Sequence, residues 1–143
     1  MNLAERQAAL VAALVAGADA PEGFDTRHLA AARAALLAKR AEEVRQVWPA
    51  LCAAYGPQWA GVFARWADSR PPQGALRDGW DFALDHPPTA GGMVELRIRQ
   101  ATWVRPRSGP LRRRRLPMIR WCASETSRHR IALQLAGRIY LLP

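Results

Sequence analysis

The sequence predicts an α+β fold, in which a bundle of about five helices precedes a small antiparallel β-sheet. Up to about residue 88, apolar residues recur at the three- and four-residue spacing of amphipathic helices. After the segment HPPTAGG they alternate with polar residues, which is the period of a half-buried strand. We therefore divide the 143-residue chain into a helical domain over residues 1–88 and a small basic β domain over residues 92–143.

The first twenty residues predict a helix and not an export signal. Asn2 followed by Glu5 has the spacing of a capping box, and Leu10 and Leu14 share one face of a helix that ends at Gly17. Glu5 stands where a signal peptide has its basic leader, and no run approaches the roughly 20 apolar residues of a membrane span. We expect a reduced, cytoplasmic protein.

Four more helices are predicted before residue 88. Asp25 or Thr26 caps the second and longest, over about residues 27–47. Pro49 suits the first position of a short helix over PALCAAY, and Pro57 opens another. The segment RPPQG breaks the chain, and ALRDGWDFALDH forms the last helix.

Four segments are predicted as strands. In VELRIR, residues 94–99, apolar and charged side chains alternate strictly. Three later segments are also predicted as strands, namely PMIRWCA, HRIALQL and RIYLLP. A tight turn at Ala136-Gly137 joins the last two as in a hairpin. About fifty residues are too few for a sheet with two covered faces, so we expect one face to pack on the helices and the other, Arg-rich face to meet water.

The positive charge is confined to the last third of the chain. Residues 1–91 carry 9 basic and 10 acidic side chains, whereas residues 92–143 carry 12 and 2. Four consecutive arginines, Arg112 to Arg115, stand in SGPLRRRRLPMIRW between two prolines, in a predicted loop or hairpin tip. This run is either a solvated turn or part of a surface for a polyanion or an acidic peptide.

Residues that would carry catalysis are not apparent. His28, His86 and His129 lack the partners of a metal or acid–base motif, and no Gly-rich phosphate loop is present. The two cysteines, Cys52 and Cys122, lie far apart and form neither a CxxC pair nor a zinc site. We expect no catalytic residues, no metal, no cofactor and no enzyme activity in this chain.

The basic β domain carries the candidate binding residues. A sheet edge beside this charge can accept an extended peptide as an added strand. Trp103 and Trp121 either stack on a base or peptide side chain or pack into the core. The candidates for peptide or polyanion binding are Arg97, Arg99, Trp103, Arg105, Arg107, Arg112, Arg113, Arg114, Arg115, Arg120 and Trp121, with Arg128 and Arg130 beside them.

The helical part carries the other four tryptophans. Their large area favours a place in the core of a small domain, and any that are exposed are candidates for contact with a partner protein. These candidates for a partner interface are Trp48, Trp59, Trp66 and Trp80.

Residues 47 to 86 resemble a bacterial family of small helical proteins that carry the label "DNA-binding domain" and are better described as partner subunits. The resemblance covers about residues 27–86. The shared pattern is an aromatic-Pro pair, a Gly, an aromatic helix, a Pro-Pro and a Gly before a closing aromatic helix. Its elements here are Trp48-Pro49, Gly56, Trp59 with Phe63, Pro71-Pro72, and Gly79 with Trp80 and Phe82.

The resemblance implies a heterodimeric partner of the multinuclear non-heme iron-dependent oxidases, which modify ribosomally made precursor peptides. In such pairs the iron belongs to the other chain, the helical domain docks on the enzyme, and the β part helps to hold the leader of the precursor peptide. The chain is then an adaptor. The alternative is a nucleic-acid-binding protein in which the arginines neutralise phosphates, although the net-negative helical part contains no basic recognition helix.

Overall fold

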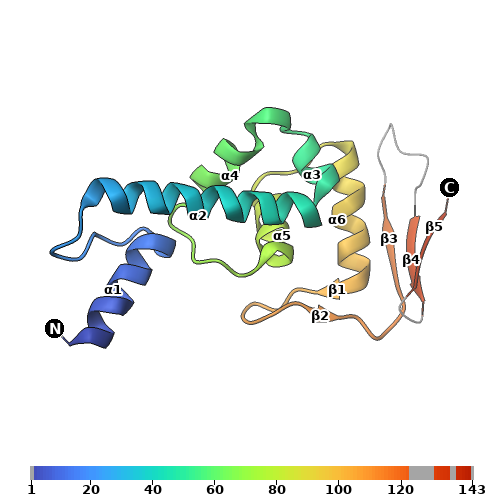
Figure 1. Ribbon diagram of the computed structural model, residues 1–143. Coiled ribbons are helices and arrows are strands. Elements are labelled where there is room, and N and C mark those ends of the chain that lie inside the picture. The colour runs from blue at the N-terminus through green and yellow to red at the C-terminus, as the bar shows by residue number, and fades with distance from the viewer. Residues whose placement is uncertain (1, 123–130, 136–137, 143) are drawn as a thin grey trace.

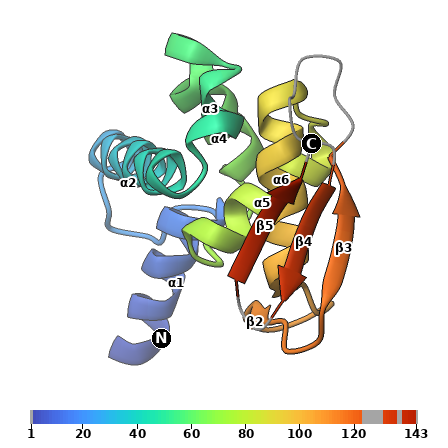
Figure 2. The same cartoon turned by 90° about the vertical axis from the view of Figure 1, so that its right-hand side faces the viewer.

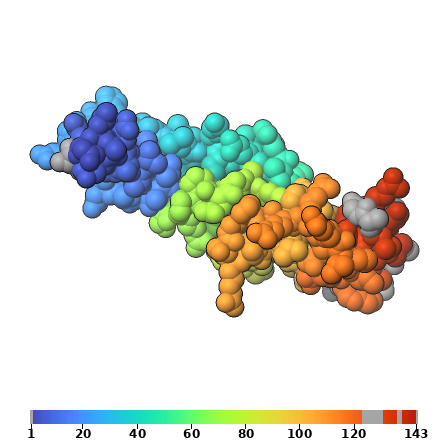
Figure 3. All heavy atoms as spheres, turned by 90° about the horizontal axis from the view of Figure 1, so that it is seen from below, coloured from blue at the N-terminus to red at the C-terminus, as the bar shows by residue number. Residues whose placement is uncertain are grey.

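The computed structural model describes residues 2–122, 131–135 and 138–142. It has the predicted α+β architecture, with six α-helices followed by two small antiparallel sheets. The molecule is elongated, with the first helix at one end and the last sheet at the other (Figures 1 and 3). Among the described helices, none combines the length and apolar character needed to cross a bilayer.

The first two helices begin at the predicted caps. In α1 (Leu3–Ala16), the Asn2 side chain accepts from the Glu5 amide at 2.9 Å and the Glu5 carboxylate accepts from the Asn2 amide at 2.8 Å, which confirms the capping box. Gly17 ends the helix with φ 72°, the left-handed conformation that glycine adopts without strain. Asp25, and not Thr26, caps the long α2 (Thr26–Val47).

Helices α3 (Pro49–Ala53), α4 (Trp59–Ala67) and α5 (Ala75–Asp85), with the short 3₁₀ turn η1 (Gly56–Gln58), complete the predicted bundle. They enclose a core in which aromatic rings pack on one another at centroid distances between 5.1 and 5.9 Å. Phe82 lies at its centre and touches four of them. These neighbours are Tyr55, Trp59, Phe63 and Trp66.

The strand predicted for VELRIR is wrong: residues 94–99 lie in a sixth helix, α6 (Ala90–Thr102). One side of α6 packs on α3 and another on the sheet, so the helix is covered from two directions (Figure 1). Leu96 is buried towards the bundle, and Val94 and Ile98 project from the opposite side of a helix with 3.6 residues per turn. Two apolar stripes on opposite sides therefore produced the alternation that we interpreted as a strand.

Two separate sheets follow α6. Strands β1 (Trp103–Val104) and β2 (Arg112–Arg113) form a hairpin whose connection is the RPRSGPL segment, so the first two arginines of the run lie on a strand and not at the tip. Strands β3 (Met118–Trp121), β4 (Ile131–Leu135) and β5 (Arg138–Leu142) form an antiparallel sheet in that order and confirm the last three predicted strands. The predicted turn at Ala136-Gly137 lies outside the described residues, and its flanks Leu135 and Arg138 are paired.

One face of the three-stranded sheet packs on α6, as predicted, but the other face is not Arg-rich. The register places Ile119, Leu133 and Tyr140 in one row across the strands and Trp121, Ile131 and Leu142 in the next. Both rows point away from the half-buried or buried Arg120, Ala132 and Gln134, which alternate with them towards α6. Figure 2 views the sheet from this free side, which is apolar and aromatic.

Candidate binding surfaces

The β1–β2 hairpin is held against α5 by buried and half-buried ion pairs. Arg105 Nε donates to Asp81 Oδ1 at 2.5 Å, and Arg77 Nε donates to Asp81 Oδ2 at 3.3 Å. Arg77 also donates to the carbonyl of Gly109, in the hairpin connection, at 2.7 Å. One carboxylate therefore fixes both the hairpin and the arginine that holds its tip, so Arg105 has a structural partner and is not free to bind a ligand.

Trp103 packs and does not offer an open ring. Its side chain is half-buried against the aromatic core, and the Arg113 guanidinium lies 5.4 Å from the ring centroid. Of the two alternatives for this residue, the structure therefore supports packing. Trp121 differs, because 67% of it is exposed.

Three arginines of the hairpin are free to meet a ligand. Arg107, Arg112 and Arg115 are exposed, and their side chains make no hydrogen bond or ion pair with any described residue. Figure 3 shows the hairpin, in orange, projecting from the side of the molecule. We call residues 103–115 the basic hairpin.

The remaining predicted arginines do not join this surface. On α6, Arg97 donates to Gln100, and Arg99 donates to the Val47 carbonyl at 2.7 Å while its guanidinium lies 5.5 Å from the Trp48 ring. Arg114 and Arg120 are half-buried. Arg128 and Arg130 lie outside the described residues. The predicted single cluster is therefore wrong, since several of its members stabilise the fold.

The predicted partner interface of four tryptophans is also corrected. Trp48, Trp59 and Trp80 are at most 5% exposed, so they have no surface to offer a partner. The Trp48 and Trp59 indoles donate to the carbonyls of Leu76 and Ala41. Only Trp66 is half-exposed, and its indole donates to Asp85 at 2.8 Å while Arg70 covers its ring.

Two apolar surfaces were missed from the sequence. The first is the free side of the three-stranded sheet, where Ile119 is 60%, Leu135 44%, Tyr140 46% and Leu142 42% exposed. We call this the outer sheet face and include Trp121, Ile131 and Leu133 in it. In RIYLL the consecutive apolar residues Ile139 to Leu142 occupy both alternating positions, which was a signal that both faces of this strand are apolar.

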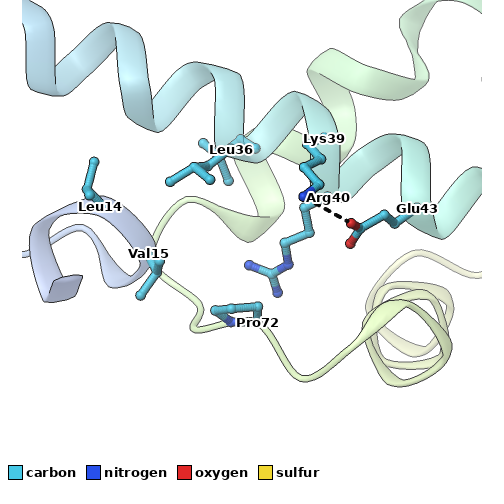
Figure 4. A pocket seen from close by; sticks show the side chains of 8 residues that line it. Leu14, Val15, Leu36, Lys39, Arg40, Glu43 and Pro72 are labelled. Carbon is cyan, nitrogen blue, oxygen red and sulfur yellow. Dashed lines mark ion pairs between the residues drawn. The ribbon is translucent and has the colours of Figure 1, made fainter.

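The second surface is a groove of about 180 Å³ between α1, α2 and the loop before α5 (Figure 4). Leu14 and Val15 of α1, Leu36 of α2 and Pro72 form its apolar wall. Lys39 and Glu43 form an ion pair on its rim at 3.9 Å. The lining of the groove is mostly apolar, which suits contact with an apolar side chain of another protein.

The described residues contain no group of three His, Cys, Asp or Glu side chains placed to hold a metal ion. Burial raises the pKa of the Cys52 thiol to about 12 and also raises that of Cys122, so both thiols stay protonated. The His86 ring stacks on the Phe82 ring, with the two ring centroids 4.5 Å apart, so His86 packs at the edge of the aromatic core.

The comparison with protein families matches residues 4–87 to the family described as "SCO6045-like, C-terminal domain". The chain belongs to this family. The match covers α1 to α5, the bundle around Phe82. No solved structure matches the SCO6045-like chain.

A relative in Streptomyces avermitilis, named "UPF0276 protein", is 41% identical over 122 residues, which cover 83% of this SCO6045-like chain but 25% of the relative. The chain therefore spans about a quarter of the relative's length. An alignment that covers this share of 143 residues has to extend beyond α5 and to include the basic hairpin.

Proposed function

We propose that this SCO6045-like chain is a non-catalytic adaptor, which binds a multinuclear non-heme iron oxidase and helps to recruit a ribosomally made precursor peptide. The observation that carries the proposal is the length of the relative. A region homologous to this chain is joined there to a further polypeptide of about three times its size. A domain that occurs as part of a longer chain is a good candidate to act beside a larger protein when it is a separate chain.

The bundle supplies the surface for the enzyme. The groove between α1, α2 and Pro72, with the exposed Val11 one turn before Leu14 and Val15 on α1, is the apolar surface of the bundle best suited to this contact. Burial of apolar area is the main favourable term in protein association. This replaces the tryptophans that the sequence indicated.

The basic hairpin and the edge of β3 supply the surface for the peptide. Among the described strands β3 pairs with β4 alone, so its outer edge keeps main-chain groups for an added strand. Arg112, on β2, and Arg115, between β2 and β3, are exposed. They favour a peptide with acidic side chains.

One preparation tests the adaptor against the nucleic-acid alternative. The tagged chain is purified from its native host after nuclease treatment at moderate salt, and its companions are identified by mass spectrometry. An iron-containing barrel enzyme in stoichiometric amount supports the adaptor. Nucleic acid without a protein companion contradicts it, and its affinity then falls with log salt by about 0.9 per phosphate contact on duplex DNA.

A matched pair of variants locates the peptide surface once the partner is known. Arg112→Ala/Arg115→Ala removes two exposed charges from the basic hairpin, and Arg6→Ala/Arg65→Ala removes the same charge from exposed positions on α1 and α4. We expect the first variant alone to weaken peptide binding while the heterodimer stays intact. A heterodimer that dissociates instead places the arginines in the enzyme interface.

A further inference from the structure

The outer sheet face is an apolar surface that the described elements leave uncovered. Seven apolar side chains of three adjacent strands lie on it, in the rows that the strand register defines. Trp121 and Ile119 are more than half exposed there. An aromatic and aliphatic patch of this kind is typical of a protein interface, where tryptophan and tyrosine contribute most of the binding energy.

The face offers side chains and no main-chain groups. Strand β4 pairs with β3 on one side and with β5 on the other, so its amides and carbonyls are used within the sheet. An extended peptide laid on this face would leave its own main chain without partners, whereas a helix satisfies its hydrogen bonds internally. The occupant that suits the face is therefore a helix.

The dimensions of the face also fit one helix. Strands of four and five residues at about 3.3 Å per residue extend about 15 Å, and three strands about 4.8 Å apart present a width of about 10 Å. A helix is about 10 Å wide and covers that length in about three turns. The opposite face is already covered by a single helix, the 13-residue α6.

The charged residues around the outer sheet face determine which kind of helix it can bind. Arg138 lies at one end of the outer sheet face, and Arg115 is exposed just before β3. The only described acidic residue after residue 91 is Glu95, which lies on the far side of α6 and accepts from the Leu51 amide. A second copy of the chain would bring two basic surfaces together, which is unfavourable.

We propose that the outer sheet face binds an amphipathic α-helix of a partner protein, whose apolar stripe is flanked by acidic side chains. The bound helix completes a three-layer arrangement of helix, sheet and helix, with α6 as the other outer layer. The binding site is distinct from the β3 edge and the bundle groove, so the inference does not depend on the proposed function.

The test uses three fluorescein-labelled synthetic peptides of about 18 residues and the full chain. One is an amphipathic helix with a leucine stripe and glutamate flanks, the second has lysine for glutamate, and the third has the composition of the first in strict apolar–acidic alternation. Fluorescence anisotropy measures binding. We expect saturable binding of the acidic helix and binding of the other two at least tenfold weaker.

Two variants place the binding on this face. Ile119→Thr and Trp121→Thr change exposed side chains, so the fold persists, which circular dichroism checks, and each is expected to weaken acidic-helix binding at least tenfold. Leu3→Gln removes an apolar side chain that is 72% exposed on α1 and is the matched control, with binding within twofold of the native chain.

Several results overturn the proposal. They are no saturable binding of the acidic helix, equal or tighter binding of the lysine helix or of the alternating peptide, and no effect of either threonine variant. A dimer of the chain in sedimentation experiments that Trp121→Thr abolishes also overturns it, because a second copy is then the occupant.

Discussion

Gly79 lies flat against the indole of Trp48, with no room for a side chain between them. A Cβ on Gly79 would stand 2.2 Å from Trp48 Cδ1, and Trp48 is fully buried and donates its indole N–H to the Leu76 carbonyl. The Trp48 ring therefore holds α5 at two points, because it packs on Gly79 and donates to the Leu76 carbonyl. A shift of the ring would cost this hydrogen bond. This contact explains why a glycine stands in the middle of α5, where glycine otherwise weakens a helix.

We expect Gly79→Ala to destabilise the fold by about 3 kcal/mol, the upper range for overpacking of a core. The change in the free energy of unfolding is measured by urea titration, with circular dichroism as the signal. Gly61→Ala is the control, because its Cβ would meet only the end of Arg65 at 3.7 Å on exposed α4. That change is expected to stabilise by about 0.5–1 kcal/mol, the helix propensity of alanine over glycine. Equal effects at the two positions would contradict the role of Trp48.

The buried ion pair between Arg40 and Asp78 supports a second prediction. Arg40 Nε donates to Asp78 Oδ2 at 2.6 Å with both side chains at most 10% exposed, and Asp78 also accepts from the Gln73 amide. Asp78→Ala leaves the guanidinium buried without its anionic partner and with only the Arg70 and Pro71 carbonyls as acceptors, so we expect a loss of about 3–5 kcal/mol. The same unfolding experiment with Lys39→Ala, which breaks an exposed pair with Glu43, should leave the midpoint unchanged. A small effect of Asp78→Ala would mean that water reaches Arg40.

The features that were predictable from sequence are those that depend on neighbours along the chain. Asn2 with Glu5, and Asp25 before α2, cap their helices through contacts three residues apart or less, so spacing alone identifies them. The strand segments β3 to β5 likewise follow from their apolar composition. These local signals were sufficient for the α+β class, the first five helices and the last three strands, but not for α6 or the β1–β2 hairpin.

The features that were not predictable depend on what covers each element. The apolar residues of α6 serve two layers at once, and no sequence period distinguishes that from a strand with one buried face. Arginine also has two uses. Arg99 and Arg105 donate to groups far away along the chain, whereas the side chain of Arg112 bonds to no described residue. Only the tertiary contacts distinguish a structural arginine from an exposed one.

The pH dependence of stability contains a contribution from Glu95. Its carboxylate accepts from the Leu51 amide at 2.8 Å, but burial is the larger effect and raises its pKa above the usual value. The folded state therefore holds the proton more tightly than the unfolded state, and the contribution of Glu95 to stability falls as the pH rises through its folded pKa. We expect the stability of Glu95→Gln relative to the native chain to increase from about pH 4 to pH 7. A constant difference would contradict the raised pKa.

The two thiols are expected to resist modification in the folded chain. Cys52 is 3% exposed and Cys122 is fully buried, and burial raises the pKa of both. At about pH 8 neither is a thiolate, so we expect a thiol reagent to react with both only after denaturation. Val11→Cys, at a position that is 56% exposed on α1, is the control and should react at once. Fast reaction of two thiols in the native chain would show that the core opens.

Asp81 is expected to keep the basic hairpin in place. It pairs with Arg105 of the hairpin and with Arg77, which in turn holds the Gly109 carbonyl. Asp81→Ala releases both arginines, and we expect tryptic cleavage within residues 105–115 to become about tenfold faster, which corresponds to about 1.4 kcal/mol of lost closure.

Asp68→Ala is the control for this experiment. Asp68 also binds an arginine, Arg33 at 2.7 Å, but at the α1–α2 end of the molecule, so its loss should leave cleavage of the hairpin unchanged. If both variants accelerate cleavage equally, global unfolding exposes the arginines and Asp81 is no anchor. If neither does, the main-chain bond from the Arg114 amide to the Thr102 carbonyl is sufficient to hold the hairpin. An effect of Asp81→Ala alone means that this carboxylate holds the basic hairpin, and with it the exposed arginines, in place on α5.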